Sequence, residues 1–352
     1  MTSELSKCGS AFNGSLAKGC EHCINGSKMV LFVTGRCATG CFYCPVSNEK
    51  KGRDVIYANE QMVGSDDDII SEAVYMDATG TGITGGDPLM NMDRTLRIIR
   101  MLKERFGKGH HIHLYTSTID REKVAALEAA GLDEIRFHPP MDVWECIGTT
   151  ELGNIISSSD MDVGIEVPAV PDLSDRLEKL VADVVDMKID LININELEFS
   201  ESNWEMMSAR HYGLKDEISS AVLDSERAAK RILKRFPNAN IHFCSSSFKD
   251  SVQLRKRLIR TAERNAKGYD VVTEDGTVLK GIIYADDLEA AAELLRNEYD
   301  VPDELMFIDN TRKRMEIASW IVEEIAQELP FKCYVVEEYP TADRLEVERT
   351  PL

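Results

Sequence analysis

Three cysteines stand close together near the start of the chain, in the run Cys37-Ala-Thr-Gly-Cys41-Phe-Tyr-Cys44. Thiolates at this C-x3-C-x2-C spacing on one short loop suit three corners of a [4Fe–4S] cluster and leave its fourth iron without a protein ligand. A structural zinc site would need a fourth Cys or His to complete a tetrahedron, and residues 45–51 provide neither. The spacing alone leaves three interpretations open, namely a catalytic cluster, a structural metal and free core cysteines.

A second group of cysteines consists of the C-x2-C pair Cys20 and Cys23, with Cys8 before it and Cys244 far along the chain. Pairs at this spacing chelate zinc or iron–sulfur clusters. The chain has nine cysteines but no basic and apolar leader typical of secretion, so a disulfide framework is not expected. We therefore expect a second metal site, either zinc or iron–sulfur, at Cys20, Cys23 and Cys244. The alternative is that these cysteines only fill the core.

The cysteines are set among seven apolar, β-rich segments that alternate with segments of helical periodicity. The strands are expected at 29–34, 79–84, 111–116, 134–137, 162–167, 190–195 and 240–244. The helices are expected at 66–76, 92–106, 121–130, 144–158, 173–187 and 225–236. This alternation predicts a parallel sheet with helical crossovers, either doubly wound or curled toward a barrel.

The pattern changes after about residue 249. A basic helical stretch at 253–267 precedes a hairpin signal at Glu274-Asp275-Gly276, helices near 286–298 and 311–329, and two final strand-like runs. The basic stretch favours a solvated helix face over a contact for a phosphorylated or nucleic-acid substrate. We therefore expect three parts: an irregular N-terminal extension at 1–28, an α/β domain at 29–245 and an α+β domain at 246–352.

Composition excludes several classes of protein. The chain has 41 Lys and Arg against 61 Asp and Glu, a net charge of −20, which argues against tight nonspecific binding to nucleic acid. No apolar stretch approaches the roughly 20 residues of a membrane-spanning helix, so no membrane association is expected. Together with the missing secretion signal, these features predict a cytoplasmic protein.

The cysteine run, with the aromatic Tyr43 directly before its last cysteine, resembles the signature of the radical S-adenosylmethionine (SAM) superfamily. The resemblance implies that Cys37, Cys41 and Cys44 hold a [4Fe–4S] cluster whose open iron binds SAM. It further implies that one-electron reduction cleaves SAM to methionine and a 5′-deoxyadenosyl radical, the cofactor supplying the difficult chemistry.

A second match lies at the end of the second expected strand, in Thr84-Gly85-Gly86-Asp87-Pro88. The superfamily carries a Gly-Gly-Glu-Pro-like motif there, and Asp87 replaces the usual Glu. The resemblance implies that Gly85 and Gly86 let backbone carbonyls approach the SAM ammonium while Asp87 adds opposite charge. In isolation, the same residues would be read as an ordinary turn.

The other SAM contacts are expected at the C-terminal ends of the strands, where the working residues of parallel barrels lie. By resemblance, Ser117 or Arg136 holds the SAM carboxylate, Glu166 the ribose hydroxyls and Asn195 the adenine edge. The alternative for each is a cap of the following helix or turn. His138, which precedes two prolines, is interpreted as a histidine held in a rigid turn.

These observations predict a partial (β/α)6-type radical SAM barrel with an N-terminal Cys-containing extension and a C-terminal α+β domain. The chain looks like the archaeal group described as relatives of pyruvate formate-lyase activating enzyme. The expected function is reductive SAM cleavage for hydrogen abstraction from an unidentified substrate, with a one-electron reductant of ferredoxin or flavodoxin type as partner. The alternative function is a noncatalytic metal-binding or regulatory module with structural zinc.

Overall fold

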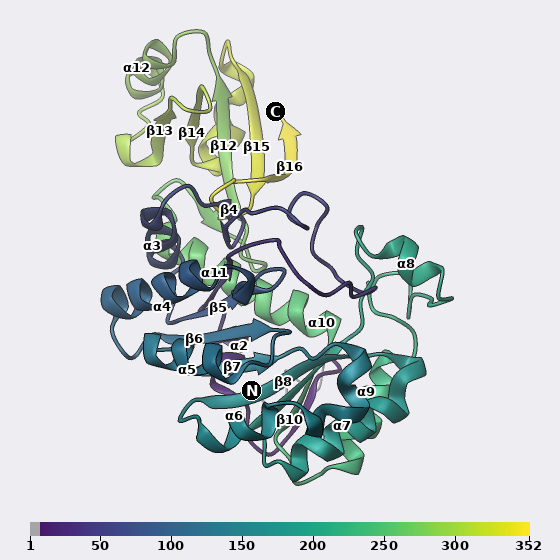
Figure 1. Ribbon diagram of the computed structural model, residues 1–352. Coiled ribbons are helices and arrows are strands. Elements are labelled where there is room, and N and C mark those ends of the chain that lie inside the picture. Colours follow the sequence, from purple (N-terminus) through teal and green to yellow (C-terminus); the bar gives the residue numbers. More distant parts are fainter. Residues whose placement is uncertain (1–7) are drawn as a thin grey trace. The chain divides into compact units, whose positions relative to one another are not determined.

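A computed structural model describes residues 8–352, which form two compact units. The N-terminal unit consists of residues 8–74 and 78–254, and the C-terminal unit consists of residues 75–77 and 255–352. Each unit is built on a sheet of its own (Figure 1).

The N-terminal unit contains a ten-stranded sheet with the order β1-β10-β9-β8-β7-β6-β5-β2-β3-β4. Seven neighbouring strands of this described sheet are parallel: β2 (Lys28–Phe32), β5 (Gly80–Thr84), β6 (His111–Thr116), β7 (Glu134–Phe137), β8 (Asp162–Ala169), β9 (Leu191–Glu196) and β10 (Ile241–Cys244). Antiparallel strands extend both edges: β1 (Ala11–Asn13) beside β10, and β3 (Tyr57–Ala58) and β4 (Gln61–Met62) beyond β2.

Helices connect the parallel strands in chain order. They are α3 (Asp66–Tyr75), α4 (Met92–Phe106), α5 (Arg121–Ala130), α6 (Leu152–Ser158), α7 (Ser174–Asp186) and α9 (Ser225–Arg235). Shorter segments are α2 (Lys18–Ile24), α8 (Trp204–Ser208), α10 (Ser246–Phe248), the 3₁₀ turns η1 (Pro88–Asn91), η2 (Met141–Thr149) and η3 (Pro171–Leu173), and the π-helical η4 (Lys249–Leu254).

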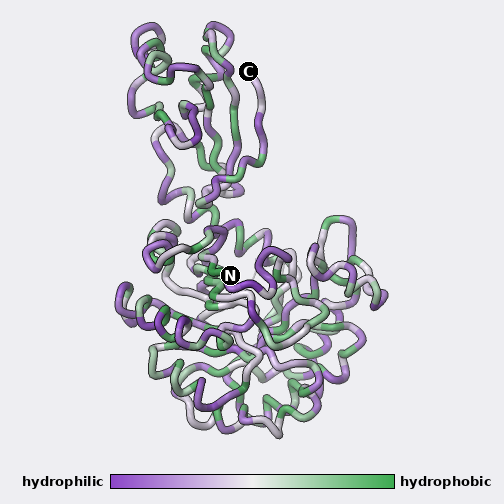
Figure 2. The backbone as a smooth tube through the Cα atoms, turned by 45° about the horizontal axis from the view of Figure 1, so that its top comes forward, coloured by the Kyte–Doolittle hydropathy of each residue, from purple (hydrophilic) through white to green (hydrophobic). Residues whose placement is uncertain are grey.

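The connecting helices form because their apolar residues recur at helical spacing between clear end signals. In α7 the buried side chains are Leu177, Leu180, Val181 and Val184, which form one stripe. Figure 2 shows this pattern as short hydrophobic stretches alternating with hydrophilic ones along the helices. Asp120 caps the start of α5, where its carboxylate accepts a hydrogen bond from the Lys123 N–H, and Gly131 caps the end of the helix in a left-handed conformation.

The predicted fold class, a partial α/β barrel with a separate α+β part, is confirmed. All seven predicted strands are present, and neighbouring pairs of them are hydrogen-bonded in parallel. Because parallel strands point the same way, their C-terminal ends meet along one edge of the sheet. The loops that follow these ends carry the residues singled out from the sequence.

Two local predictions for the N-terminal unit are wrong. The extension is not irregular over residues 8–28, because β1 pairs with β10 and α2 packs against β2, β5 and β6; residues 1–7 lie outside the described part. The helix predicted at 144–158 is interrupted, since Cys146 leaves the helical conformation. The Thr149 and Thr150 hydroxyls donate to the carbonyls of Cys146 and Ile147, which competes with helix continuation.

The C-terminal unit is an antiparallel sheet with helices. Its strands are β11 (Val271–Val272), β12 (Val278–Tyr284), β13 (Met306–Asp309), β14 (Arg314–Ile317), β15 (Lys332–Glu338) and β16 (Glu346–Pro351). Its helical segments are α11 (Arg255–Asn265), α12 (Leu288–Glu298), α13 (Ser319–Ile325) and the 3₁₀ turns η5 (Asp303–Leu305) and η6 (Ala326–Glu328). The predicted turn ending at Gly276, which has a φ of 83°, joins β11 to β12.

The helix predicted at 311–329 is wrong in its first half. Residues 314–317 form β14, which pairs with β12 and β13, and only the following residues form α13. Arg314 and Glu316 alternate with Met315 and Ile317, so one face of the strand enters an ion network and the other enters the core. None of the helices within residues 8–352 is long and apolar enough to cross a membrane.

Candidate active site

A cavity of about 370 Å³ lies at the C-terminal ends of the parallel strands. Nine residues that the sequence singled out line it: Cys37, Cys41, Tyr43, Cys44, Gly85, Gly86, Ser117, Glu166 and Asn195. They come from the loop after β2 and from the ends of β5, β6, β8 and β9. The topology therefore gathers into one cavity residues that lie up to 158 positions apart in the chain (37 to 195).

The cysteine loop places its three thiols on the wall of this cavity. Cys37 is exposed, and Cys41 and Cys44 are half-buried. Burial opposes ionisation of Cys41, but the neighbouring polar groups of His138 and Tyr43 outweigh it and lower the pKa of its thiol from the ordinary 9.0 to about 7. The thiolate is the form that binds iron, so Cys41 is suited to be a metal ligand.

The donor set fits an iron–sulfur cluster in type and number. Within residues 8–352, no three His, Cys, Asp or Glu side chains are gathered closely enough to share one metal ion. A cubane requires a different arrangement, because each thiolate binds its own iron and the ligands surround a volume. Cys37, Cys41 and Cys44 line one cavity, so each thiol can bind a different iron of a cluster that lies inside it.

Gly85 and Gly86 line the cavity and also have a structural role, while their expected contact with the SAM ammonium stays a prediction. A Cβ atom on Gly85 would lie 2.5 Å from the Thr34 carbonyl oxygen, and one on Gly86 would lie 2.4 Å from the Arg36 carbonyl oxygen. The Gly86 and Asp87 N–H groups donate to those same carbonyls, at 2.7 and 2.8 Å. The glycine pair therefore lets the cysteine loop pass directly against the end of β5.

Asp87 lies behind the cavity wall and does not line it. Its carboxylate accepts hydrogen bonds from the Thr116 hydroxyl at 2.8 Å, the Ser117 hydroxyl at 2.7 Å and the Thr118 hydroxyl at 3.0 Å. It also accepts from the Leu89 N–H at 3.0 Å, which caps η1. These contacts position Ser117 at the cavity, and a direct contact of Asp87 with the SAM ammonium stays a prediction.

Arg136 also lies below the cavity and supports Glu166. The guanidinium donates to Glu166 Oε2 at 2.7 Å and to the buried carboxylate of Glu134. Glu166 Oε1 accepts from the Asn195 amide at 2.8 Å. Burial alone would raise the pKa of Glu166, but Arg136 and Asn195 outweigh it and hold that pKa below its usual value. Glu166 therefore presents an ionised carboxylate to the cavity, while a contact of Arg136 with SAM stays a prediction.

His138 joins the cysteine loop to the end of β8. Its Nδ1 lies 2.7 Å from the Glu166 carbonyl oxygen, and its Nε2 lies 2.7 Å from the Tyr43 hydroxyl. A carbonyl only accepts, so Nδ1 carries the proton and Nε2 accepts from Tyr43. His138 lines the cavity, so the interpretation as a histidine merely held in a turn omitted this role.

Lys249 and Glu198 were missed by sequence reasoning. Both line the cavity, where they form an ion pair. Lys249 follows the seventh parallel strand and Glu198 follows the sixth. Their positions a few residues beyond strand ends were the available signal in the sequence.

The second group of cysteines is not gathered as metal ligands in the described residues. The Gln253 side chain lies between two of them: its Oε1 accepts from Cys23 Sγ at 3.4 Å, and its Nε2 donates to Cys244 Sγ at 3.4 Å. Cys20 instead accepts from Arg136 Nη2 at 3.4 Å. Burial raises the pKa of Cys20 to about 11 and that of Cys244 to about 12, which favours neutral thiols.

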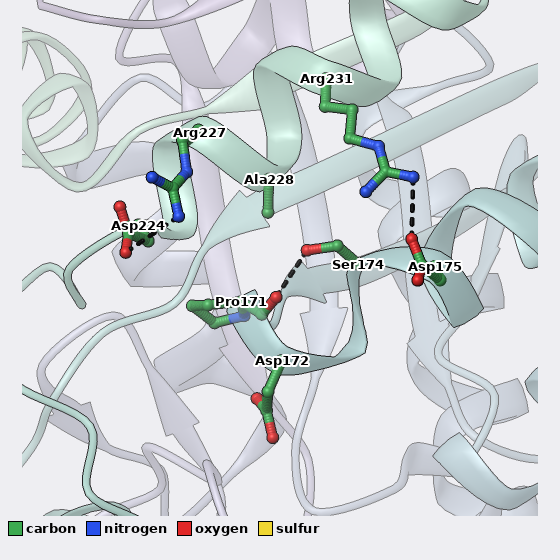
Figure 3. A pocket seen from close by; sticks show the side chains of 8 residues that line it. All are labelled: Pro171, Asp172, Ser174, Asp175, Asp224, Arg227, Ala228 and Arg231. Atoms are coloured by element: carbon green, nitrogen blue, oxygen red, sulfur yellow. Dashed lines mark hydrogen bonds and ion pairs between the residues drawn. The ribbon is translucent and has the colours of Figure 1, made fainter.

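A second hollow, of about 380 Å³, lies where α7 and α9 begin. Its charged residues are paired with one another or with neighbours, as Figure 3 shows for Arg231 with Asp175 and for Arg227 with Asp224. It contains none of the predicted site residues. The chemistry expected from the sequence therefore concentrates in the cavity beside the cysteine loop.

Comparison with known proteins agrees with this assignment. Residues 31–139 match the Radical SAM superfamily, and residues 276–352 match a domain of unknown function, DUF8061. A protein of Methanocaldococcus jannaschii named "Putative glycyl-radical enzyme activating enzyme" is 40% identical over 359 aligned positions, which cover 96% of this chain and 93% of the relative.

Among solved structures, Streptococcus suis SuiB bound to S-adenosylmethionine is 12% identical with a TM-score of 0.42, covering 63% of this chain and 51% of SuiB. The chain thus spans about half the length of SuiB. Native anSMEcpe with bound AdoMet is 13% identical with a TM-score of 0.40, covering 71% of this chain and 73% of anSMEcpe. Residues 31–139 match the superfamily and the 40% identical relative covers 96% of the chain, so this chain is an enzyme that belongs to the radical SAM superfamily.

Proposed function

We propose that the enzyme cleaves SAM reductively and uses the resulting radical to remove a hydrogen atom from a glycine residue of a partner protein. The observation that carries the first step is the single cavity lined by the three cysteines, the glycine pair and the ionised Glu166. The glycine substrate is suggested by the name of the 40% identical relative.

Cys37, Cys41 and Cys44 would hold a [4Fe–4S] cluster, and the remaining cavity would hold SAM. When bound and reduced, the cluster supplies the electron that splits SAM into methionine and a 5′-deoxyadenosyl radical. Glu166 would accept hydrogen bonds from the ribose hydroxyls, because a carboxylate with its charge fixed by Arg136 is a strong acceptor for a diol. Asn195, held by Glu166, offers the remaining polar edge for adenine.

Each hydrogen atom removed from the substrate consumes one SAM molecule and one electron. Removal of a hydrogen atom from the glycine Cα would yield 5′-deoxyadenosine from the SAM-derived fragment and a glycyl radical on the partner protein. The electron that began the sequence comes from an external one-electron reductant. The protein itself would shield the reaction from water and position SAM through Glu166 and Asn195.

The cluster assignment is tested by iron analysis and by EPR after anaerobic reconstitution and reduction. We expect about four irons per chain and a [4Fe–4S]⁺ signal that changes when SAM is added. Replacing Cys37, Cys41 and Cys44 with Ala should remove both. One tightly bound zinc and no iron would instead support the structural-zinc alternative.

The glycine assignment is tested with protein extract from the host organism grown on glycine deuterated at Cα. Transfer of deuterium into 5′-deoxyadenosine is the expected result. Undiminished 5′-deoxyadenosine formation without deuterium would exclude glycine Cα while leaving SAM cleavage intact. The control is extract from unlabelled cells, which sets the natural isotope level.

A second metal site at Cys20, Cys23 and Cys244 stays part of the proposal. Metal binding there would have to displace the Gln253 amide and ionise two buried thiols, so it requires a rearrangement of η4. Metal analysis of the Cys37/Cys41/Cys44 triple Ala variant decides it. Stoichiometric residual zinc or iron supports the site, and a folded, metal-free variant contradicts it.

A further inference from the structure

Tyr43 anchors the cysteine loop in the N-terminal unit. Its side chain is only 8% exposed and packs in a hydrophobic cluster whose other buried members are Val170, Leu197, Phe199, Met207 and Val222. Its carbonyl accepts a hydrogen bond from the Asn203 amide at 3.0 Å. Tyr43 stands between Cys41 and Cys44 in the chain, so whatever fixes its ring also restricts the two cysteines beside it.

His138 holds the polar end of this ring. The Tyr43 hydroxyl donates to His138 Nε2 at 2.7 Å, and His138 Nδ1 donates to the Glu166 carbonyl oxygen at 2.7 Å. The backbone of His138 is fixed as well, because its N–H donates to the Thr116 carbonyl at 2.7 Å and the following Pro139 restricts its conformation. His138 is therefore a bridge whose two ring nitrogens contact two different segments.

Glu166 takes part in this bridge and in the cavity through different atoms. Its carbonyl oxygen holds His138, while its carboxylate lines the cavity and accepts from Arg136 at 2.7 Å and from the Asn195 amide at 2.8 Å. The bridge thus runs from the cysteine loop to the residue proposed to bind the ribose of SAM. Nε2 faces the cluster end of the bridge, and Nδ1 faces the SAM end.

We infer that His138 is a positioning residue that acts in two directions, holding the cysteine loop through Tyr43 and the SAM-binding carboxylate through Glu166. The inference rests on the proposed function, because it requires a cluster at the three cysteines. Residues that orient metal ligands through hydrogen bonds contribute about 10- to 100-fold to metal affinity. The imidazole transfers no proton in this role, since both of its nitrogens are engaged in positioning contacts.

Asparagine and glutamine at position 138 separate the two directions. The Gln amide reaches the position of Nε2, where its oxygen can accept from Tyr43. The shorter Asn amide reaches the position of Nδ1, where its nitrogen can donate to the Glu166 carbonyl. Each variant therefore keeps one half of the bridge and loses the other.

Two quantities are measured on freshly reconstituted protein without reductant: the rate of iron release to a chelator and the equilibrium affinity for SAM. We expect His138→Asn to release iron about tenfold faster while its SAM affinity stays within about twofold of the unaltered protein. His138→Gln should show the opposite pattern, with iron release within about twofold and SAM affinity lowered about threefold. A residue with a merely structural role would lower both quantities in both variants.

Tyr43→Phe removes only the hydroxyl, so it should match His138→Asn in its rate of iron release. The matched control is Tyr212→Phe, because the Tyr212 ring stacks on Phe42 of the same loop with centroids 6.0 Å apart while its hydroxyl donates to Asp172. This control should leave the rate of iron release unchanged.

Equal losses of iron retention and SAM affinity in both variants at position 138 would overturn the inference, and so would unaltered behaviour of both. Iron release from Tyr212→Phe as fast as from Tyr43→Phe would also overturn it, because the effect would then not depend on His138. If the unaltered protein takes up no iron, the proposed function fails and the inference fails with it. Stable iron in the unaltered protein and in all variants defeats the inference alone.

Discussion

Both units bury arginine–glutamate networks, but the two networks have different surroundings. In the N-terminal unit Arg136 donates to Glu134 and Glu166, and Glu166 reaches the cavity. In the C-terminal unit Arg314 donates to Glu316 at 2.7 Å and to Glu338 at 3.0 Å. Both arginines are almost fully buried. The same chemical pairing therefore occurs once beneath a proposed active site and once inside a domain of unassigned role.

The difference lies in how many cations share the carboxylates. Lys280 and Arg344 also pair with Glu316 and Glu338, so removal of one cation leaves two others. The carboxylates around Arg136 have no second Lys or Arg within ion-pair distance in the described residues. Redundant pairing is typical of a structural role, whereas a single buried cation that holds one cavity carboxylate indicates a positioning role.

The largest effect is expected from Arg136→Met, which removes the one Lys or Arg that pairs, within the described residues, with the buried Glu134 and the cavity-lining Glu166. We expect the free energy of unfolding to fall by about 3–5 kcal/mol, as when one partner of a buried pair is lost. SAM affinity should fall as well, because Glu166 loses its fixed orientation. Chemical denaturation and equilibrium SAM binding measure the two effects, and unchanged SAM affinity in a folded variant would contradict the positioning role.

Asp87→Ala should act mainly on SAM binding and little on cluster content. Loss of the carboxylate frees the Ser117 and Thr118 hydroxyls at the cavity wall. We expect a loss of about 1.5–3 kcal/mol, roughly ten- to a hundredfold in SAM affinity. Asp309→Ala is the matched control, since Asp309 caps a turn of the C-terminal unit by accepting from the Thr311 and Arg312 N–H groups. If both variants bind SAM as tightly as the unaltered protein, Asp87 is an ordinary turn residue.

Arg314→Met should cost less than Arg136→Met because Lys280 and Arg344 remain beside the same carboxylates. We expect a loss of about 1–3 kcal/mol in the stability of the C-terminal unit, with no change in 5′-deoxyadenosine formation under dithionite. Denaturation followed by Trp320 fluorescence reports on this unit, once the other tryptophans are replaced by Phe. A cost equal to that of Arg136→Met would remove the distinction between redundant and single pairing.

The last expected effect is a pH dependence in the C-terminal unit. Burial alone would raise the pKa of Glu316, but Lys280, Arg314 and Arg344 outweigh it and lower that pKa from 4.5 to about 2. A depressed carboxylate pKa stabilises the fold fully above about pH 4.5, and the contribution disappears as the pH falls toward 2. Glu316→Gln should flatten the stability profile between pH 4.5 and 2. If the free energy of unfolding of the variant still falls as steeply with decreasing pH, Glu316 is not the source of this pH dependence.

Sequence patterns predicted the strands well because buried parallel strands are short, mostly apolar and bounded by turn residues, as in β10. They failed at β14, where Arg314 and Glu316 are buried only because cations and carboxylates from distant strands meet there. They failed similarly at α2, a short helix whose packing against three strands is a tertiary effect.

The candidate site was predictable to the extent that its residues follow strand ends. That rule correctly predicted that Glu166 and Asn195 line the cavity. It could not distinguish Ser117, which lines the cavity, from Arg136, which lies beneath it. The distinction depends on which way each side chain points from its strand, and strand-end position alone does not determine that direction. Likewise, the hydrogen bonds of His138 connect three segments of the chain, so no local pattern contains them.

The central claim is that the cavity beside the cysteine loop cleaves SAM, and the most direct test is product analysis in a single anaerobic incubation. Reconstituted protein is mixed with SAM and dithionite, and 5′-deoxyadenosine and methionine are quantified by chromatography. The account predicts equal amounts of both products from the unaltered protein and none from the Cys37/Cys41/Cys44 triple Ala variant. Intact SAM with the iron-loaded, unaltered protein, or equal cleavage by the triple variant, would contradict the account.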